Sequence, residues 1–223
     1  MKAAPVVLTI HAVDARGEEG VTADAATFAE LLCRPVHVVT SLLLVGASGG
    51  ASLEALSPAL VARQLETLSG DLRPSAARTG ILTDAAQVAE IAALLAARVA
   101  GPVVVAPVAR VAGNRITDDA TIEASRKLLF PIADVVLVRA GDLGVVIGER
   151  PQDLEGMLRA AAAVRALGAR AALVAGGAFL GRMLDVLDDG GRTSIFDASR
   201  IAAPRVAGLA GAHAAALTAF LAR

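Results

Sequence analysis

Hydrophobic and polar positions near the start of the chain form a strand–loop–helix–strand pattern. An apolar run covers residues 6–10, a polar loop with glycines covers 14–20, and a second β-branched run covers 36–40. Between the loop and the second run, apolar residues recur at helical spacing, at Phe28, Leu31 and Leu32. This pattern predicts a βαβ unit. Ligands of open α/β sheets bind at the carboxyl ends of strands, where the loop is expected.

The same alternation continues to the C-terminus. Helical patterns cover residues 57–68, 84–99, 117–129, 151–167 and 208–223. Strand-like runs cover residues 102–108, 133–138 and 171–174, and the runs 183–187 and 192–196 flank the turn sequence Asp-Asp-Gly-Gly. Alternating strands and helices predict a mostly parallel sheet with helices on both faces, and the two last runs predict a hairpin. We expect one three-layer α/β/α domain over residues 1–223.

Composition narrows the class of protein. The chain has 223 residues, which suits one large α/β domain. It is 55% hydrophobic with a mean hydropathy of +0.62, much of it from alanine. Residues 1–12 are interpreted as a first strand rather than a secretion signal, because Pro5 and an acidic loop interrupt the pattern. Residues 206–222 are too short and too alanine-rich for a membrane span, so they predict a helix that closes the domain.

Charge, aromatic content and cysteine content argue against several functions. The formal net charge is −1 and aromatics make up 2% of the chain, so binding to nucleic acid is not expected. The single cysteine, Cys33, cannot form an internal disulfide and suits the reducing cytoplasm. Its apolar neighbours predict a buried structural thiol on the first helix.

The segment from residue 12 to 28, AVDARGEEGVTADAATF, resembles a known family signature. It is similar to the pattern G-x-D-P-S-G-G-A-G-x-x-A-D-x-K-x-F of hydroxymethylpyrimidine and phosphomethylpyrimidine kinases, ribokinase-like enzymes of thiamine biosynthesis. The matching positions are Asp14, Gly17, Gly20, Ala23, Asp24 and Phe28. Glu18 and Glu19 stand where the family has a glycine and an alanine. The resemblance implies a ribokinase-like fold, Mg-ATP as cofactor, a small pyrimidine-like ligand and a homodimer.

The resemblance also implies where the substrate would lie. The implied substrate-binding positions are Asp14, Gly20, Asp24, Val45, Ile81 and Val108. Val45 replaces a glutamine that contacts the pyrimidine in the family, whereas Ile81 and Val108 keep the apolar lining. Asp24 has two interpretations, a contact to the ligand or a first-turn acid that interacts with the helix dipole.

Positions on the phosphate side depart from the family. Where the family carries aspartate, asparagine, glutamate, lysine and a cysteine or aspartate, this chain has Ala106, Ala140, Leu143, Ala175 and Gly211. Gly208 matches the first glycine of a helix N-terminus that binds anions in the family. Asp142 lies one position from a lost group. His213 lies about 200° from Gly211 around an ideal helix, so a His satisfied within the fold is the better interpretation.

Three functions remain open at this stage. We favour a kinase-family protein that has lost phosphoryl transfer and acts as a small-molecule-binding or regulatory homologue, with no catalytic or metal-binding residue and no certain cofactor. The first alternative is an active kinase that uses Mg-ATP and displaced groups, among them Asp14, Glu18, Glu19 and Asp142. The second alternative is a structural, dimer-forming subunit without a ligand. All three are expected in the cytoplasm, without a membrane or nucleic-acid partner.

Overall fold

A nine-stranded, mostly parallel sheet forms the centre of the computed structural model, which describes residues 3–46, 49–68, 72–179, 181–201 and 208–223. The order is β11-β10-β9-β8-β5-β4-β1-β2-β3, and the pairs from β9 to β2 are all parallel. The strands are β1 Val6–Asp14, β2 Arg34–Val45, β3 Ala51–Ala55, β4 Ala76–Thr79, β5 Val103–Val105, β8 Val135–Arg139, β9 Ala171–Phe179, β10 Arg182–Asp188 and β11 Thr193–Ser199. A separate ribbon pairs β6 Arg110–Val111 with β7 Asn114–Arg115.

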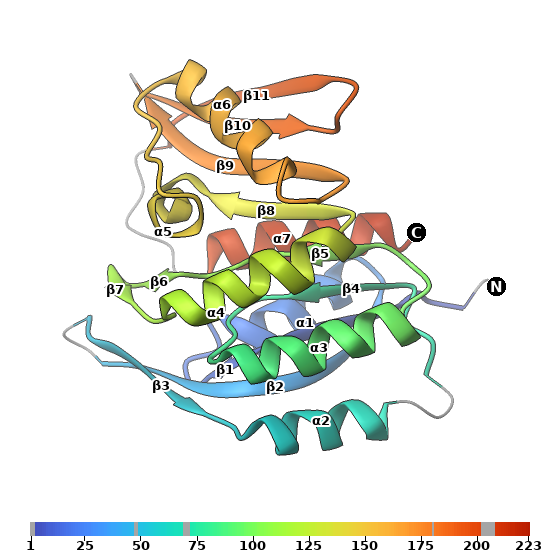
Figure 1. The fold of residues 1–223 in the computed structure, drawn as a ribbon. Helices are drawn as coiled ribbons and strands as arrows, with labels where there is room; N and C mark the ends of the chain where they lie inside the picture. Colours follow the sequence, from blue (N-terminus) through green and yellow to red (C-terminus); the bar gives the residue numbers. More distant parts are fainter. Residues whose placement is uncertain (1–2, 47–48, 69–71, 180, 202–207) are drawn as a thin grey trace.

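Helices cover both faces of this sheet, so the three-layer prediction is confirmed. They are α1 Gly20–Glu30, α2 Pro58–Thr67, α3 Ala85–Arg98, α4 Asp119–Ala124, α5 Leu143–Val146, α6 Leu154–Arg165 and α7 Leu209–Leu221. In Figure 1, α1 and α7 lie behind the sheet, while α2, α3, α4 and α6 lie in front. The larger apolar core joins the sheet to the front helices, and a smaller one joins Val7 of β1 to α1 and α7.

The structure confirms the predicted hairpin and corrects two helices. β10 and β11 pair in antiparallel fashion, as the turn sequence predicts. The prediction that Leu32 continues the apolar face of the first helix is wrong. α1 ends at Glu30, and Leu32 has a φ of +57° and is 73% exposed. The helix predicted over residues 117–129 is divided into α4 and a π-helix, Ser125–Leu129.

The N-termini of α1 and α7 differ from those of α2, α3, α4 and α6 in how they are capped. Side chains of Ser57, Asp84, Asp118 and Asp153 cap α2, α3, α4 and α6, each accepting a backbone N–H. The N-cap residues of α1 and α7, Glu19 and Gly208, make no such cap to their own helix. These two helix starts contact each other instead, because Gly208 N donates to Glu19 Oε1.

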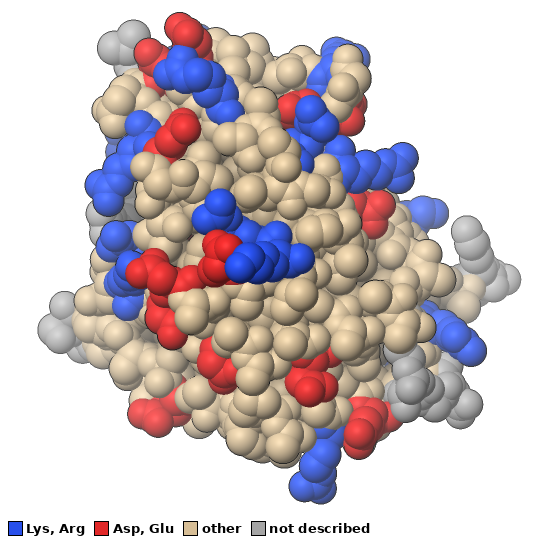
Figure 2. All heavy atoms as spheres, in the orientation of Figure 1, with Lys and Arg blue, Asp and Glu red and all other residues tan. Residues whose placement is uncertain are grey.

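The outer surface carries charges of both signs. Figure 2 shows acidic and basic side chains intermingled over one face. Several form exposed ion pairs, such as Glu123 with Arg126 and with Lys127. Within the described part of the chain, every helix is too short or too polar to cross a membrane.

A tight contact between β1 and the end of β4 gives a test of the packing. Gly80 follows β4, and a Cβ there would lie 1.9 Å from Cδ2 of the fully buried His11. We predict that Gly80→Ala lowers the free energy of unfolding by about 1–3 kcal/mol, because an added methyl overpacks the core. Urea denaturation measures this change. His11→Ala combined with Gly80→Ala should recover part of the loss, and unchanged stability of Gly80→Ala would contradict the packing.

Candidate functional site

Three of the predicted substrate-side residues come together at the carboxyl ends of the parallel strands. Val45 ends β2, Ile81 follows β4 and Val108 follows β5, and all three belong to one apolar cluster with Leu43 and Ala12. Ile81 is fully buried, whereas Val45 and Val108 are partly exposed. The cluster therefore presents an apolar surface at the edge of the sheet where ligands of such folds bind.

The Asp14 carboxylate stabilises the loop that follows β1. Its carboxylate accepts backbone N–H groups from Arg16 at 3.1 Å, Glu18 at 3.0 Å and Glu19 at 3.2 Å. The side chain is 4% exposed. The prediction placed Asp14 at the ligand. In the structure its oxygens fold the loop and direct Glu19 toward α7.

Asp24 is fully buried, and both of its oxygens have protein donors. Thr9 Oγ1 donates to Oδ2 at 2.5 Å, and Arg78 Nη1 lies 2.5 Å from Oδ1. The first-turn interpretation is wrong, because α1 begins at Gly20 and Asp24 lies in its second turn. Contact between Asp24 and a ligand gains no support from this geometry.

The ion pair between Arg78 and Asp24 links four elements in the interior. Arg78 lies on β4, pairs with Asp24 of α1, and donates from Nη1 to the Gly211 carbonyl of α7 at 2.9 Å. Burial raises the pKa of Asp24, while the Arg78 charge and the Thr9 hydroxyl of β1 lower it. A buried arginine so placed fixes the first turn of α7 against the sheet.

The side chain of Glu19 contacts the start of α7. Its Oε1 accepts from Gly208 N at 3.0 Å, and its Oε2 lies 3.4 Å from where a Cβ would stand at Gly211. Gly208 has a φ of +75°, and a Cβ there would lie 1.8 Å from the Glu18 carbonyl oxygen. Only glycine satisfies both constraints. The loop after β1 is thus packed directly on the N-terminus of α7.

A second close approach fixes the other side of the loop. Gly20, a predicted substrate-side residue, has a φ of +75°, and a Cβ there would lie 2.0 Å from the Ala12 carbonyl oxygen. Gly20 therefore has a backbone reason to be glycine. The loop enters α1 at this point, immediately after Glu19.

The protonated form of the Glu19 carboxyl is more favoured in the protein than it would be in water. Burial raises the pKa of the Glu19 carboxyl, and the Asp24 charge acts in the same direction. The Gly208 N–H and the charges of Arg139 and Arg78 lower it. The net shift is upward, because withdrawal from water disfavours the carboxylate more than these partners favour it.

The predicted phosphate-side positions lie in apolar surroundings. Ala106, Ala175 and Ala214 of α7 share one buried cluster with side chains of β5, β8 and β9. Leu143 is fully buried in the larger core, and Ala140 packs against it. Gly211 is partly exposed, and a Cβ built there would lie nearest to the Glu19 carboxylate.

Asp142 and His213 are polar residues that lie close in sequence to positions where the family resemblance implies lost groups. Asp142 is 2% exposed and forms an ion pair with Arg139, whose Nε lies 2.7 Å from Oδ2. Burial raises the pKa of Asp142, and the Arg139 charge opposes the shift. His213 is exposed, so the prediction that it is satisfied within the fold is wrong.

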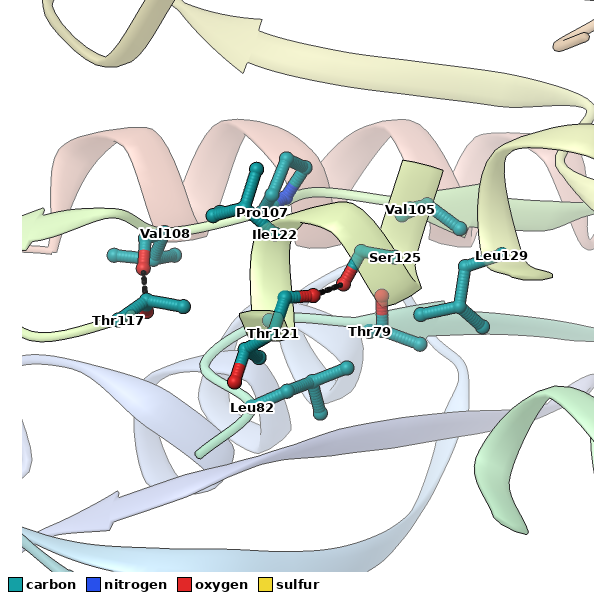
Figure 3. Close-up of a pocket in the computed structure, with 11 residues that line it drawn as sticks. Thr79, Leu82, Val105, Pro107, Val108, Thr117, Thr121, Ile122, Ser125 and Leu129 are labelled. Carbon is teal, nitrogen blue, oxygen red and sulfur yellow. Dashed lines mark hydrogen bonds between the residues drawn. The ribbon is translucent and has the colours of Figure 1, made fainter. Parts of the chain in front are cut away.

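A small pocket lies beside the predicted substrate residues, between β4, β5 and α4. Figure 3 shows Thr79, Val108, Thr117, Thr121 and Ser125 around it. Thr117 donates to the Val108 carbonyl and Ser125 to the Thr121 carbonyl. The cavity volume is about 10 Å³, which is room for the centre of about one water molecule. It is too small to hold a nucleotide or a pyrimidine.

Comparison with known proteins gives the family. A family model described as phosphomethylpyrimidine kinase matches residues 14–223. The chain belongs to the phosphomethylpyrimidine kinase family. It is 33% identical over 224 residues to the hydroxymethylpyrimidine/phosphomethylpyrimidine kinase of Synechococcus elongatus, covering 97% of this chain and 83% of the relative. The corresponding kinase of Streptomyces coelicolor is 32% identical over 198 residues, covering 88% and 73%.

Solved structures agree with the fold. The pyridoxal kinase of Staphylococcus aureus in complex with AMP-PCP and pyridoxal has a TM-score of 0.91 and 26% sequence identity, covering 99% of this chain and 81% of that one. The ribokinase-like α/β fold is therefore confirmed. Taken alone, these comparisons favour the active-kinase alternative over a loss of phosphoryl transfer, because each of these relatives is named as a kinase.

Sequence reasoning missed Arg78 and underrated Glu19. Arg78 lies in the otherwise small and apolar strand Ala76–Thr79, and an arginine inside a buried strand requires a buried acid. That signal could have paired it with Asp24. No local pattern places Glu19 at α7, because Gly208 lies 189 residues away in the sequence.

The buried ion pair yields a stability prediction. Arg78→Met should lower the free energy of unfolding by about 3–5 kcal/mol, because Asp24 would keep a buried charge without its partner. Chemical denaturation with a circular dichroism signal measures the loss. Arg159→Met is the matched control, since its pair with Glu155 is exposed and should contribute about 0–1 kcal/mol. A loss below 1 kcal/mol for Arg78→Met would sink the assignment.

The raised pKa of Glu19 yields a pH prediction. A carboxyl group whose folded pKa exceeds its unfolded value favours folding at low pH, and this contribution is lost as the pH rises through the two values. Glu19→Gln removes it. The free energy of unfolding of Glu19→Gln, minus that of wild type, should therefore grow from about pH 4 to pH 7. Glu18→Gln, at an exposed neighbour, is the control, and a difference that stays flat or shrinks contradicts the prediction.

Proposed function

We propose that the chain binds a small aromatic heterocycle on the apolar cluster of Val45, Ile81 and Val108, here called the substrate end of the site. We also propose that it has lost ATP-dependent phosphoryl transfer. One contrast between the two ends carries the proposal. Val45, Ile81 and Val108 gather at the substrate end. At the phosphate end, Ala106 and Ala175 pack with Ala214 in an apolar cluster where a kinase needs charged and polar groups.

We infer that the start of α7 does not accept Mg-ATP while the Glu19 carboxylate lies there. The Gly208 N–H, which would face an anion, already donates to the Glu19 carboxylate. A negative side chain at this place repels a phosphate group. We infer that Glu19 closes the described part of the nucleotide side, and we derive no step through ATP or magnesium.

The ligand class follows from the apolar cluster and from the relatives. Two relatives are named for hydroxymethylpyrimidine and phosphomethylpyrimidine, and a structural relative holds pyridoxal. All three compounds are substituted planar heterocycles, and Val45, Ile81 and Val108 offer aliphatic surface on which a flat ring can pack. Asp14 and Asp24 are engaged with protein donors.

An active kinase is the second candidate, and the comparisons favour it. One structural observation also does so. Glu19 Oε2 lies 3.4 Å from the Cβ position of Gly211, where the family resemblance implies the catalytic base. The Glu19 carboxyl has a raised pKa, which suits a general base. In this candidate Glu19 replaces the lost group at Gly211.

A homodimer, a structural role without ligand and a cytoplasmic location stay predictions.

The proposal predicts ligand binding without turnover. Hydroxymethylpyrimidine or pyridoxal should raise the melting temperature, and either compound with Mg-ATP should give product at a rate about 10⁴-fold below the roughly 1–100 s⁻¹ of kinases. Thermal shift and a coupled ADP assay measure the two quantities. Val45→Asp should abolish the thermal shift. Leu44→Asp, on the opposite and exposed face of β2, should leave it intact.

Two outcomes would overturn this proposal. Product formation at a kinase-like rate that falls at least about 100-fold in Glu19→Ala would establish the second candidate. Absence of a thermal shift with all of these heterocycles would remove ligand binding. The circular dichroism spectrum of each variant checks that a lost signal does not come from unfolding.

A further inference from the structure

The start of α7 has the physical properties of an anion site. A helix N-terminus carries free N–H groups and a partial positive charge, so it attracts negative groups. α7 has 13 residues, and its N-cap Gly208 lacks a side chain to cap the helix. The group that binds there is the Glu19 carboxylate, which arrives from the loop after β1. An internal carboxylate thus stands in the place of an external anion.

Arg78, which contacts the same turn of α7, has buried donors that could face an anion. Its guanidinium is fully buried and contacts the first turn of α7 through the Gly211 carbonyl. Its Nε and Nη2 have no hydrogen-bond partner in the described part of the chain. Nε2 of the buried His11, beside Arg78, also lacks one there. Buried donors without acceptors are costly, so an anion or its hydration water near them would be stabilised.

We propose that Glu19 is an autoinhibitory latch, a carboxylate that occupies the anion site formed by the α7 N-terminus and Arg78 and must leave before a sulfate- or phosphate-like group binds. This inference rests on the proposed function, and it explains closure of the phosphate end by the presence of the Glu19 carboxylate there. The packing of the loop supports it. The Glu18 carbonyl is pressed against Gly208, and Asp14 holds the backbone of Glu18 and Glu19 in this position.

The charges around Glu19 come from every element that packs on it. Arg78 of β4 and Arg139 of β8 attract it, and Asp24 of α1 repels it. Burial lowers the pKa of His11 on β1 well below its ordinary value, so His11 is neutral near pH 7 and offers Nε2 as a donor without charge. Burial raises the pKa of Glu19, so its protonation, which removes the negative charge from the site, begins at a higher pH than for a carboxyl group in water. Anion binding by the wild type should therefore strengthen as the pH falls.

Sulfate is the probe, because it stays a dianion between pH 4 and pH 8 and its own charge therefore does not change in the experiment. Isothermal titration at constant ionic strength compares wild type, Glu19→Gln and Glu19→Ala at pH 7.5. Both variants should bind sulfate about tenfold more tightly than wild type, in line with the strength of a charge at a helix N-terminus. Glu18→Gln, whose exposed carboxylate pairs with Arg16, should match wild type.

The pH series adds a readout that a merely structural role would not give. Sulfate affinity of the wild type should rise toward that of Glu19→Gln as the pH falls from 7.5 to about 5. Unchanged sulfate affinity in folded Glu19→Gln, or absence of sulfate binding in every variant, overturns the latch. The turnover assay described above judges the proposed function separately, because sulfate binding needs neither nucleotide nor heterocycle.

Discussion

The buried ion pair between Arg78 and Asp24 fixes the positions of the elements around the site. It joins β4 to α1, with Thr9 of β1 and the Gly211 carbonyl of α7 as further partners. These elements are far apart in the sequence, and apolar packing alone would leave their relative depth less defined. A charge pair in the interior tolerates little displacement, because either partner left alone would carry a large desolvation cost. The first turn of α7 therefore has one position relative to the sheet.

The two ends of the site differ in the side chains that line them. At one end, the strands deliver valine and isoleucine side chains to a surface that suits a flat ring. At the other end, α7 faces alanines and the Glu19 carboxylate. In the function proposed above, the fold of a kinase is retained, while small apolar residues and an internal carboxylate stand where the family resemblance implies phosphate-binding groups. Membership of the family and closure of the phosphate end are thus compatible.

Much of the fold could be predicted from the sequence, because hydrophobic periodicity and turn residues act locally. The parallel βαβ start and the hairpin of β10 and β11 follow from such patterns. Leu32 misled the prediction, since an apolar residue at helical spacing does not show where the helix ends. The site was harder. Asp14, Asp24 and Glu19 could be singled out as polar residues, but their partners Gly208 and Arg78 come from distant parts of the chain. Only the three-dimensional structure shows that these acids bind the protein itself.

We infer that the chain's own carboxylate, at Glu19, closes the phosphate end of the site. Titration calorimetry of the wild-type protein with AMP-PCP and Mg²⁺, the nucleotide analogue held by the Staphylococcus aureus relative, tests it most directly. We predict no saturable binding by the wild type at neutral pH. Saturable binding in the micromolar range, at which kinases commonly bind their substrates, would contradict the account.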